Sequence, residues 1–487
     1  MMDRLSHRGP DDAGTFSSPD GSGVLGFRRL SIMDPTGGHQ PIIGQDEGRA
    51  IIANGEIYNF PSIREELAAR QPFETGSDSE AILRLYEEHG TAVVQHLDGM
   101  YAFAILDGND IFLARDPIGI KPLYVGCSES TAIFASELKA LAGRCQDVTE
   151  FPPGAYYHSQ VGFSRFYEVP RCAPHHDSVA AWTRRIRETM EGCVAKQLMS
   201  DVPLGFFLSG GVDSSVICAL ARRHVDEMHT FSVGIEGSGD LEPARRVAGH
   251  LDTIHHEYVL TAEEVAQALP EVIYYLESFD QDLVRSAIPT YFTARLAAEY
   301  VDVVLTGEGA DELFAGYSYH KAIADDDILN RELRRSVGAL HNLNLQRVDR
   351  MTMAHALEAR PPFLDEEMIA LAQQVPAELK LHGSSPSEQW SKWILRKAFE
   401  EMLPAEIVWR RKAQFDEGSG LAELASAEVY ERMSNEEAEA HRARHPGIRL
   451  RSAEECYYHR LLLDAFEDPE PVVANVGRWT ERPPEIG

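Results

Sequence analysis

This chain of 487 residues lacks the long hydrophobic runs and the paired cysteines that identify several common classes of protein. It has no uninterrupted stretch of about 18 apolar residues, so a membrane-spanning helix is not expected. The polar start, MMDRLSHRGPDDAG, has no apolar segment of the kind that a secretory signal peptide requires. The six cysteines form no CxxC pair, which argues against a zinc site or a redox pair and predicts reduced thiols in the cytoplasm.

Lysine is also scarce, with 8 lysines against 38 arginines, and the net charge is −31. An excess of carboxylates repels a phosphate backbone, so nucleic acid is not an expected partner, and neither is a membrane. The composition fits either a surface adapted to high salt or an ordinary acidic bacterial protein. The length allows two or three domains.

The most informative stretch is LGFFLSGGVDSSVICAL, residues 204–220. Residues 204–208 predict a buried parallel strand, residues 209–215 a polar turn, and the residues from Val216 onward a helix. No GxxxxGK[ST] pattern is present, so this is not a Walker loop. A strand, glycine turn and helix in this order direct backbone N–H groups toward a phosphate, although an ordinary connection has the same outline.

Within this turn, Gly210 and Gly211 are expected to adopt positive φ and to let the backbone approach a ligand closely. Asp213 is unexpected beside a phosphate, because its carboxylate would repel it. A Mg2+ ion between the two charges would resolve the conflict.

A second strand, glycine turn and helix is predicted in VDVVLTGEGADELFAGY, residues 301–317. The turn contains Glu308, Asp311 and Glu312, a set that suits Mg2+ binding and proton transfer, although acids also favour any exposed helix start. Alternating strands and helices predict a doubly wound parallel sheet, in which ligands lie at the carboxyl ends of the strands. Leu208 and Val233 lie at two such ends and are expected to flank an adenine, the alternative for Val233 being a plain core position.

Polar residues of the first 80 positions suit a zwitterionic amino acid. Arg29 could bind a carboxylate through two hydrogen bonds, Asp78 could hold an ammonium group, and Asn54, Gly55 and Glu56 offer an amide, a bare backbone and an acid. Solvated turns are the alternative explanation for the same residues.

The segments HRGPDD, RRLSIMD, NGEIYNF, GSDSE, LDGMYAFAILD and ARDPIGIKPLY resemble the glutaminase domain of class II glutamine amidotransferases. The resemblance implies an αββα layered sheet domain of the Ntn-hydrolase type. It also implies that glutamine is bound by Arg29, Leu30, Ser31, Ile32, Met33, Asn54, Gly55, Glu56 and Asp78. The positions of Asn54 and the neighbouring glycine would also stabilise an oxyanion.

One feature departs from that family, whose members carry a catalytic cysteine at the start of their first strand. Here the first cysteine is Cys127, and no residue can be assigned as the nucleophile. Three explanations are open: a start set too late, a truncated gene, or an enzyme that uses only ammonia. The first is favoured because the glutamine-binding residues are all retained. A missing first strand would leave the domain truncated.

The turn at 209–215 resembles the pyrophosphate loop of the ATP-pyrophosphatase superfamily. Together with FSVGIEGSGDLEPARRVAGHLDTIHHE, LTGEGADELFAGY, MAHALEARPPFLD and the W-R-x-K-x-Q-F pattern, it makes nearly the whole chain resemble the glutamine-hydrolysing asparagine synthetases of the B type. The implied contacts to ATP and pyrophosphate are Leu208, Ser209, Gly210, Gly211, Asp213, Ser214, Ser215, Val233, Thr306 and Gly307.

The same resemblance implies Asp213 and Asp311 as Mg2+ ligands, and Glu308 and Lys412 as catalytic residues. Arg285 and Glu312 are the candidates for contacts to aspartate. The chain departs from the family pattern at Asp282-Leu283, where some relatives have threonines, at Ala310, where serine is common, and at Ala413, where glutamate is common. These departures bear on the aspartate contacts more than on the ATP contacts.

The resemblance therefore implies an ATP-dependent amidation of L-aspartate to L-asparagine through β-aspartyl-AMP, with AMP and pyrophosphate released and nitrogen taken from L-glutamine or ammonia. We expect a glutaminase domain at 1–155, a linker at 156–178 and a synthetase domain at 179–487. Two alternatives are another amide-forming adenylating ligase, such as a β-lactam synthetase, and a non-catalytic nucleotide or amino-acid sensor. The oligomeric state is left open, a homodimer included.

Overall fold

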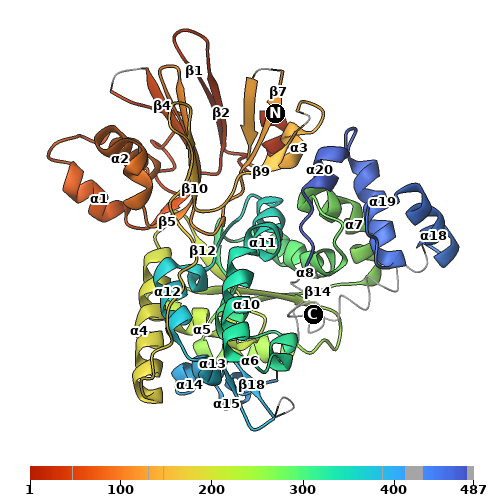
Figure 1. Cartoon of the computed structure of the whole chain (residues 1–487). Helices are drawn as coiled ribbons and strands as arrows, with labels where there is room; N and C mark the ends of the chain where they lie inside the picture. The colour runs from red at the N-terminus through yellow and green to blue at the C-terminus, as the bar shows by residue number, and fades with distance from the viewer. Residues whose placement is uncertain (46–47, 130, 146, 386–387, 412–431, 480–487) are drawn as a thin grey trace.

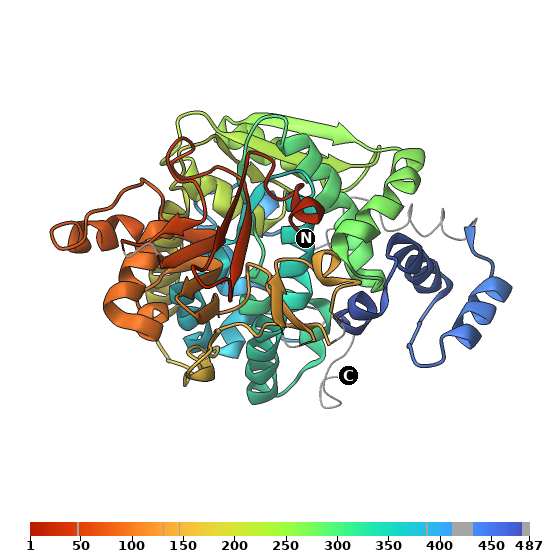
Figure 2. The same cartoon turned by 90° about the horizontal axis from the view of Figure 1, so that it is seen from above.

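The computed structural model describes residues 1–487 except 46–47, 130, 146, 386–387, 412–431 and 480–487. An N-terminal part rests on a larger C-terminal part, and each is built around its own sheet (Figure 1). Seen from above, α3 (Leu138–Leu141) of the N-terminal part lies against α20 (Glu470–Ala474) of the C-terminal part (Figure 2). Within the described residues, no helix combines the length and the apolar character needed to cross a membrane.

The N-terminal part contains a six-stranded antiparallel sheet in the order β11-β10-β6-β5-β4-β3. Its strands are β3 (Ile42–Ile43), β4 (Arg49–Ile57), β5 (Gly99–Asp107), β6 (Asp110–Arg115), β10 (Ala155–His158) and β11 (Gly162–Arg165). Two smaller sheets are formed by β1 (Asp12–Ser17) with β2 (Val24–Arg29), and by β7 (Tyr124–Ser128), β8 (Thr131–Ala135) and β9 (Thr149–Glu150). The helices are η1 (Met2–Leu5), α1 (Phe60–Leu67), α2 (Ser79–His89), η2 (Gly90–Gln95) and α3 (Leu138–Leu141).

Both faces of the six-stranded sheet are covered. Side chains alternate along β5, so Phe103 packs under α1 and α2, whereas Ala104 faces the core shared with β2 and β7. This two-sided burial explains why β5 reads as an almost continuous apolar run. The helix, sheet and sheet layering confirms the predicted layered sheet domain.

The boundary of the N-terminal part differs from the predicted linker at 156–178. α1 begins at Phe60 with Asn59 as its N-cap, and a proline fits its first turn. Asp78 is the N-cap residue of α2. The sheet continues through β11, so the irregular segment between the two parts covers 166–178.

The C-terminal part contains a five-stranded parallel sheet in the order β14-β13-β12-β15-β16. Its strands are β12 (Leu204–Phe207), β13 (His229–Gly234), β14 (Ile254–Val259), β15 (Val303–Leu305) and β16 (Glu358–Arg360), and a short hairpin is formed by β17 (Leu381–His382) and β18 (Trp390–Ser391). Along the chain, β13 and then β14 are added on one side of β12, whereas β15 and then β16 are added on its other side. This makes β12/β15 a topological switch point, where such sheets bind ligands.

Helices cover both faces of this sheet, as predicted for a doubly wound fold. α4, α5 and α6 share one core with β12, whereas α8 and α11 pack on the opposite face. Within the described residues, the helices of this part are α4 (Val179–Gln197), α5 (Val212–Ala221), α6 (Leu241–Leu251), α7 (Ala262–Leu276), α8 (Gln281–Ala297), α9 (Ala310–Phe314), η3 (Ser318–Ala322), α10 (Asp326–Gly338), η4 (Leu340–Asn342), α11 (Asn344–Met353), η5 (Pro362–Leu364), α12 (Glu366–Gln374), α13 (Ala377–Lys380), α14 (Trp393–Phe399), α15 (Ala405–Val408), α18 (Asn435–Arg444), α19 (Ala453–Ala465) and α20 (Glu470–Ala474).

Buried ion pairs join the two parts. Arg350 on α11 is fully buried and lies 3.4 Å from Glu137 of the N-terminal part and 3.1 Å from Glu277 at the end of α7. The other pairs across this interface are Arg8–Asp349, Lys139–Glu277, Lys121–Glu358 and Arg360–Glu56. Burial of so many charges is tolerated only because each has an opposite charge beside it.

Replacing Arg350 with methionine is expected to destabilise the protein by about 3–5 kcal/mol, because Glu137 and Glu277 would lose a buried counter-charge. The measurement is the urea concentration at the midpoint of unfolding. Arg70→Met is the matched control, because Arg70 pairs with Glu66 and Glu88 at the exposed surface, where a pair is worth less than about 1 kcal/mol. Equal shifts for the two variants would contradict this interpretation of the interface.

Candidate functional site

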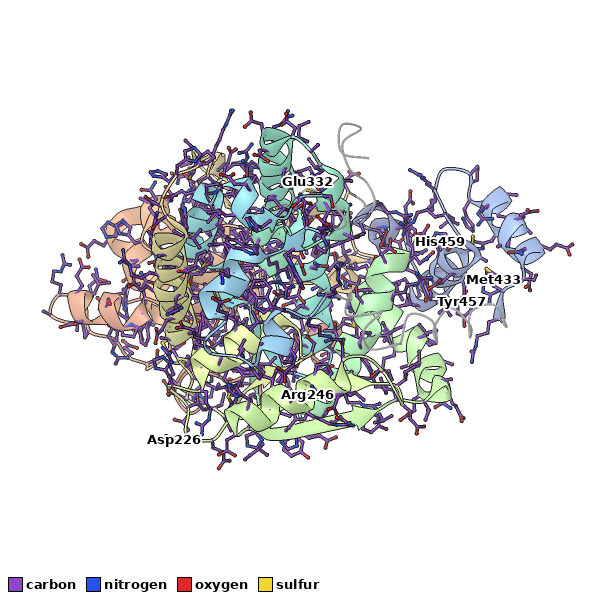
Figure 3. All side chains as sticks on the ribbon, turned by 90° about the horizontal axis from the view of Figure 1, so that it is seen from below. Asp226, Arg246, Glu332, Met433, Tyr457 and His459 are labelled. Atoms are coloured by element: carbon purple, nitrogen blue, oxygen red, sulfur yellow. The ribbon has the colours of Figure 1, made fainter. Side chains whose placement is uncertain are left out.

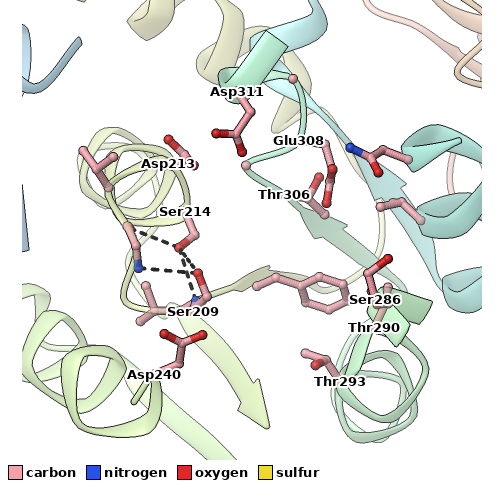
Figure 4. Close-up of a pocket in the computed structure, with 18 of the residues that line it drawn as sticks. Ser209, Asp213, Ser214, Asp240, Ser286, Thr290, Thr293, Thr306, Glu308 and Asp311 are labelled. Atoms are coloured by element: carbon pink, nitrogen blue, oxygen red, sulfur yellow. Dashed lines mark hydrogen bonds between the residues drawn. The ribbon is translucent and has the colours of Figure 1, made fainter. Parts of the chain in front are cut away.

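A cavity of about 210 Å³ opens at the switch point, between the carboxyl ends of β12, β13 and β15 (Figure 4). Most of the residues expected to contact ATP and metal line it. They are Leu208, Ser209, Gly211, Asp213, Ser214, Val233, Thr306, Gly307, Glu308 and Asp311. Among the described residues, these separate segments of the sequence therefore meet at one cavity.

The glycine turn after β12 is shorter than predicted, because α5 begins at Val212 instead of Val216. Gly210 has φ +70° as expected, and a side chain there would come within 2.5 Å of the Ala244 backbone nitrogen. Gly211 does not have positive φ: it is the N-cap of α5 with φ −80° and ψ 161°, since an N-cap residue is normally extended.

The serines of this turn play different parts. The Ser209 and Ser214 hydroxyls lie 3.2 Å apart and face the cavity, where they can donate to a bound anion (Figure 4). The Ser215 hydroxyl instead donates to the Gly211 carbonyl at 2.6 Å, so it stabilises the first turn of α5. Gly210 and Ser215 therefore shape the turn and do not line the cavity.

Asp213 and Asp311 face one another across the cavity, as Figure 4 shows, and a lysine joins them. The Lys392 ammonium lies 2.6 Å from an oxygen of each carboxylate, and its side chain is 1% exposed. Neighbouring carboxylates raise the pKa of Lys392 against the opposing effect of burial, so the amine is charged. Asp213 Oδ1 is buried and has no hydrogen-bond partner among the described residues.

These two carboxylates fit a divalent cation. Carboxylate oxygens are the ligands that Mg2+ prefers, and the unpartnered Asp213 oxygen retains lone pairs for such an ion. The approach of the two acids depends on glycine: a side chain at Gly316 would collide with Asp311, and one at Gly307 would come within 3.0 Å of Asp213.

Glu308 is held by an arginine. Arg347 Nη2 donates to Glu308 Oε1 at 2.5 Å, and both residues line the cavity. Further cations around the same cavity are Lys392, Arg396, Arg410 and Arg411. Lys412, the predicted catalytic cation, lies outside the described residues.

The two aspartate candidates are placed differently from the cavity. Arg285 turns toward α19, where its Nε donates to Glu454 at 2.9 Å. Glu312 is buried behind Tyr317, whose hydroxyl donates to it, and burial raises the pKa of Glu312 to about 7. The hydroxyl-bearing side chains that do line the cavity along α8 are Ser286, Thr290 and Thr293 (Figure 4).

A second, larger cavity of about 1120 Å³ lies in the N-terminal part. It is lined by the predicted glutamine-binding residues Arg29, Leu30, Ile32, Met33, Asn54, Gly55, Glu56 and Asp78. Ser31 is not among the lining residues; its backbone N–H donates to Asp11 at 2.8 Å. The cavity also contains Gln40, which pairs its amide with the backbone of Ala53 and which the sequence prediction missed.

The polar groups of this cavity are arranged around β4. Asn54 Nδ2 is buried without a partner among the described residues, so it can donate to a ligand oxygen. Gly55 has φ +144°, and any side chain there would collide with the Met100 carbonyl, 1.9 Å away. Asp78 accepts from the Ile57 N–H at 2.7 Å, and burial raises its pKa to about 6.

Part of the Arg29 guanidinium is already used in hydrogen bonds within the protein, so it is not all available to bind a carboxylate. Its Nη2 donates to the carbonyls of Met33 and Asp34 at 2.9 and 2.8 Å, and these bonds hold the loop that closes one side of the cavity. Sequence alone could not show this, because a buried arginine satisfies its donors with whichever carbonyls the fold brings near.

Lys392 was missed by the sequence prediction. It follows Asp213 by 179 positions, and no motif connects the two residues. A signal was present in the sequence, because Lys392 is one of only 8 lysines and lies between Trp390 and Trp393.

Known proteins match the chain along most of its length. The asparagine synthase family model matches residues 185–326 and 322–471, and the glutamine amidotransferase domain model matches residues 1–188. Asparagine synthetase [glutamine-hydrolyzing] 2 and 3 of Arabidopsis thaliana are 38% and 39% identical to it, over 95% of this chain and 83% of each relative. Asparagine synthetase B of Escherichia coli K12 is 38% identical over 96% of this chain and 87% of the relative. These matches show that the chain belongs to the asparagine synthase family.

Proposed function

We propose that this protein converts L-aspartate to L-asparagine at the expense of ATP, releasing AMP and pyrophosphate. The observation that carries the proposal is the convergence in one cavity of the phosphate-binding turn, the facing Asp213 and Asp311, and Glu308. Family membership supports the same reaction, because the relatives are named as glutamine-hydrolysing asparagine synthetases.

In this proposal the turn at 209–215 receives the β- and γ-phosphates. The Ser209 and Ser214 hydroxyls and the N-terminus of α5 supply donors to the departing pyrophosphate. Leu208, Val233 and Thr306 line the part of the cavity proposed to hold the nucleoside. Mg2+, held by Asp213 and Asp311 when bound, would neutralise phosphate charge.

A carboxylate oxygen of aspartate attacks the α-phosphorus and forms β-aspartyl-AMP. Lys412 and the described cations of the cavity counter the charge that develops on the phosphorus oxygens. Ammonia then attacks the activated carbonyl carbon, Glu308 accepts a proton from the nitrogen, and the bond from that carbon to the phosphate oxygen breaks so that AMP leaves. Arg347, which donates to Glu308, holds its carboxylate in position for that transfer.

The N-terminal cavity is proposed to bind glutamine as the source of ammonia. Asn54 Nδ2 would donate to the amide oxygen, and Asp78 would accept from the α-ammonium group. None of the described residues that line this cavity is a cysteine. For that reason ammonium is the nitrogen source we propose for an assay of these 487 residues.

With ammonium chloride as the nitrogen source, the chain is expected to release AMP and pyrophosphate only when aspartate is present, and to accumulate asparagine in equal amount. Pyrophosphate is measured enzymatically and asparagine by chromatography. Aspartate-dependent pyrophosphate without asparagine would favour a different amide-forming ligase. ATP binding without pyrophosphate release would favour a sensor. Either result would overturn the proposed reaction. Glutamine in place of ammonium tests the N-terminal cavity separately.

Lys392→Met is expected to lower the rate of pyrophosphate release by about 100-fold or more, because a cation would be removed from the phosphate site. The same variant should bind Mn2+ more tightly in the absence of nucleotide, since Lys392 no longer competes for Asp213 and Asp311. Electron paramagnetic resonance of free Mn2+ measures that affinity. Lys397→Met, one turn further along α14 and paired with Glu400, is the matched control and should change neither quantity. Weaker Mn2+ binding by Lys392→Met would contradict this role.

Glutamine binding is expected to weaken as the pH falls through about 6. Asp78 must be ionised to attract the α-ammonium group, and burial raises its pKa to about 6, so the favourable charge is present above that pH and lost below it. The dissociation constant should rise by up to about tenfold per pH unit in the acidic range. Calorimetric titration measures it.

Asp78→Asn is the control for this pH dependence and should bind weakly at every pH tested. It keeps Glu56, a second buried acid beside Asp78 whose pKa burial raises well above its usual value. A wild-type affinity that is unchanged between about pH 5 and 8 would show that Asp78 does not hold the ammonium group.

A further inference from the structure

Three histidines gather in the C-terminal lobe, away from both cavities. His441 lies on α18, His445 is the residue that ends this helix, and His459 lies on the facing α19. Each imidazole offers one nitrogen, and the three nitrogens all lie within 4.8 Å of one another. Figure 3 labels His459 in this lobe, beside Met433 and Tyr457. No other group of three such ligands is found among the described residues.

The spacing explains how two helices bring the rings together. Residues four apart lie on one face of a helix, which places His441 and His445 side by side. Their ring centroids are 4.7 Å apart, and the centroid of His459 is 5.1 Å from that of His441 and 5.0 Å from that of His445. The helices α18 and α19 are packed together through Ala438 and Cys456 as well.

Burial leaves two of these rings short of partners. His441 is 2% exposed and His459 is 0% exposed, and the only hydrogen bond between them joins His441 Nε2 and His459 Nδ1 at 2.9 Å. Among the described residues, His441 Nδ1 and His459 Nε2 have no partner. Buried polar atoms are normally paired, so these two call for an explanation.

The charge state of the rings suits a metal. Burial, reinforced by the neighbouring imidazoles and arginines, lowers the pKa of His441 and His459 to about 4. Both are therefore neutral at neutral pH, which is the form that binds a metal ion. Arg444 and Arg460 lie near enough to oppose a cation at His441, and Asp464 partly offsets them. Affinity at this site must come from the nitrogen donors more than from attraction between charges.

We infer that His441, His445 and His459 together bind one imidazole-preferring dication of the Zn2+ or Ni2+ class. Imidazole is a characteristic ligand of these ions, whereas Mg2+ prefers oxygen, so the site differs in chemistry from Asp213 and Asp311. Zn–N bonds of about 2.0–2.1 Å place tetrahedral ligand nitrogens about 3.4 Å apart. The three rings need to shift by about an ångström, and His445 is half-buried at a helix end, where such a shift is least hindered.

The consequence of such a site would be a clamp between α18 and α19. The first turn of α19 also carries Glu454, which pairs with Arg285 on α8, and Glu455, which pairs with Arg451. A metal ion on His459 would therefore brace the helix whose Glu454 pairs with Arg285 of α8. This clamp does not depend on the proposed reaction.

The test uses the full chain, stripped of metal by chelation and then equilibrated with ZnCl2 in the presence of excess Mg2+, which occupies oxygen sites. We expect one zinc ion per chain by mass spectrometry after removal of unbound metal, and a rise in melting temperature. With Co2+ in place of Zn2+, we expect visible absorption bands that are characteristic of Co2+ with a low coordination number. The thiolate charge-transfer bands that a cysteine ligand would produce should be absent.

His445→Ala is the decisive variant, because His445 is half-buried and its loss should leave the fold intact. It is expected to weaken zinc binding by more than about tenfold, since even an outer-shell change at a metal site costs about 10- to 100-fold. His441→Gln and His459→Gln should have the same effect, with circular dichroism as the check on folding.

His256→Gln is the matched control. His229 and His256 form a stacked pair with a hydrogen bond of 2.9 Å. Glu227 contacts the other nitrogen of His229, but among the described residues these groups do not come together as a three-ligand cluster. Zinc binding by this variant should equal that of the wild type. Less than one zinc per chain in the wild type, or unchanged zinc binding in His445→Ala, would show that the three rings only fill the core.

Discussion

The fully buried guanidinium of Arg360 is the contact on which the arrangement of the two cavities depends. Its side chain lies 3.5 Å from Glu56, which lines the N-terminal cavity, and 3.0 Å from Glu358. Its backbone carbonyl accepts the N–H of Thr306, which lines the switch-point cavity. A guanidinium away from water is stable only when acceptors surround it, so Arg360 fixes one residue of each cavity relative to β16.

Other buried charges at the interface between the two parts also need partners of opposite charge. Lys121 reaches Glu358 from the N-terminal part at 3.0 Å, and Arg8 reaches Asp349 on α11 at 2.6 Å. Apolar interfaces tolerate small sliding movements, whereas buried ion pairs lose their partners when the surfaces shift. An interface of this kind holds the two cavities in one geometry, which the proposed use of nitrogen from glutamine at the switch-point cavity would require.

Local patterns carried enough information to predict the elements around the switch-point cavity. The apolar run ending at Leu208 and the turn containing Glu308 each predicted a strand, a turn and a helix, because strand burial and glycine placement are local properties. The start of α5 at Val212 was missed, since small and acidic residues are equally compatible with a turn and with a first helical turn.

Contacts between distant segments were beyond the reach of those patterns. The pairing of Arg285 with Glu454 spans 169 positions, and the carbonyl contacts of Arg29 depend on how one loop folds back. From the sequence, one can infer only that a charged residue needs a partner if it is buried. The partner is chosen by the packing of the whole chain, so the roles of buried charges could be assigned only from the structure.

Lys392 shows how this limit affects the interpretation of a site. Asp213 was expected to need a cation because of its place beside phosphate, and the structure supplies one from the chain itself. Two carboxylates that face one another without a counter-charge would repel each other. Lys392, which is almost fully buried between them, offsets that repulsion in the free protein. Binding of a divalent cation then becomes an exchange of one positive charge for another, so Lys392 both holds the two acids together in the free protein and competes with the ion for them.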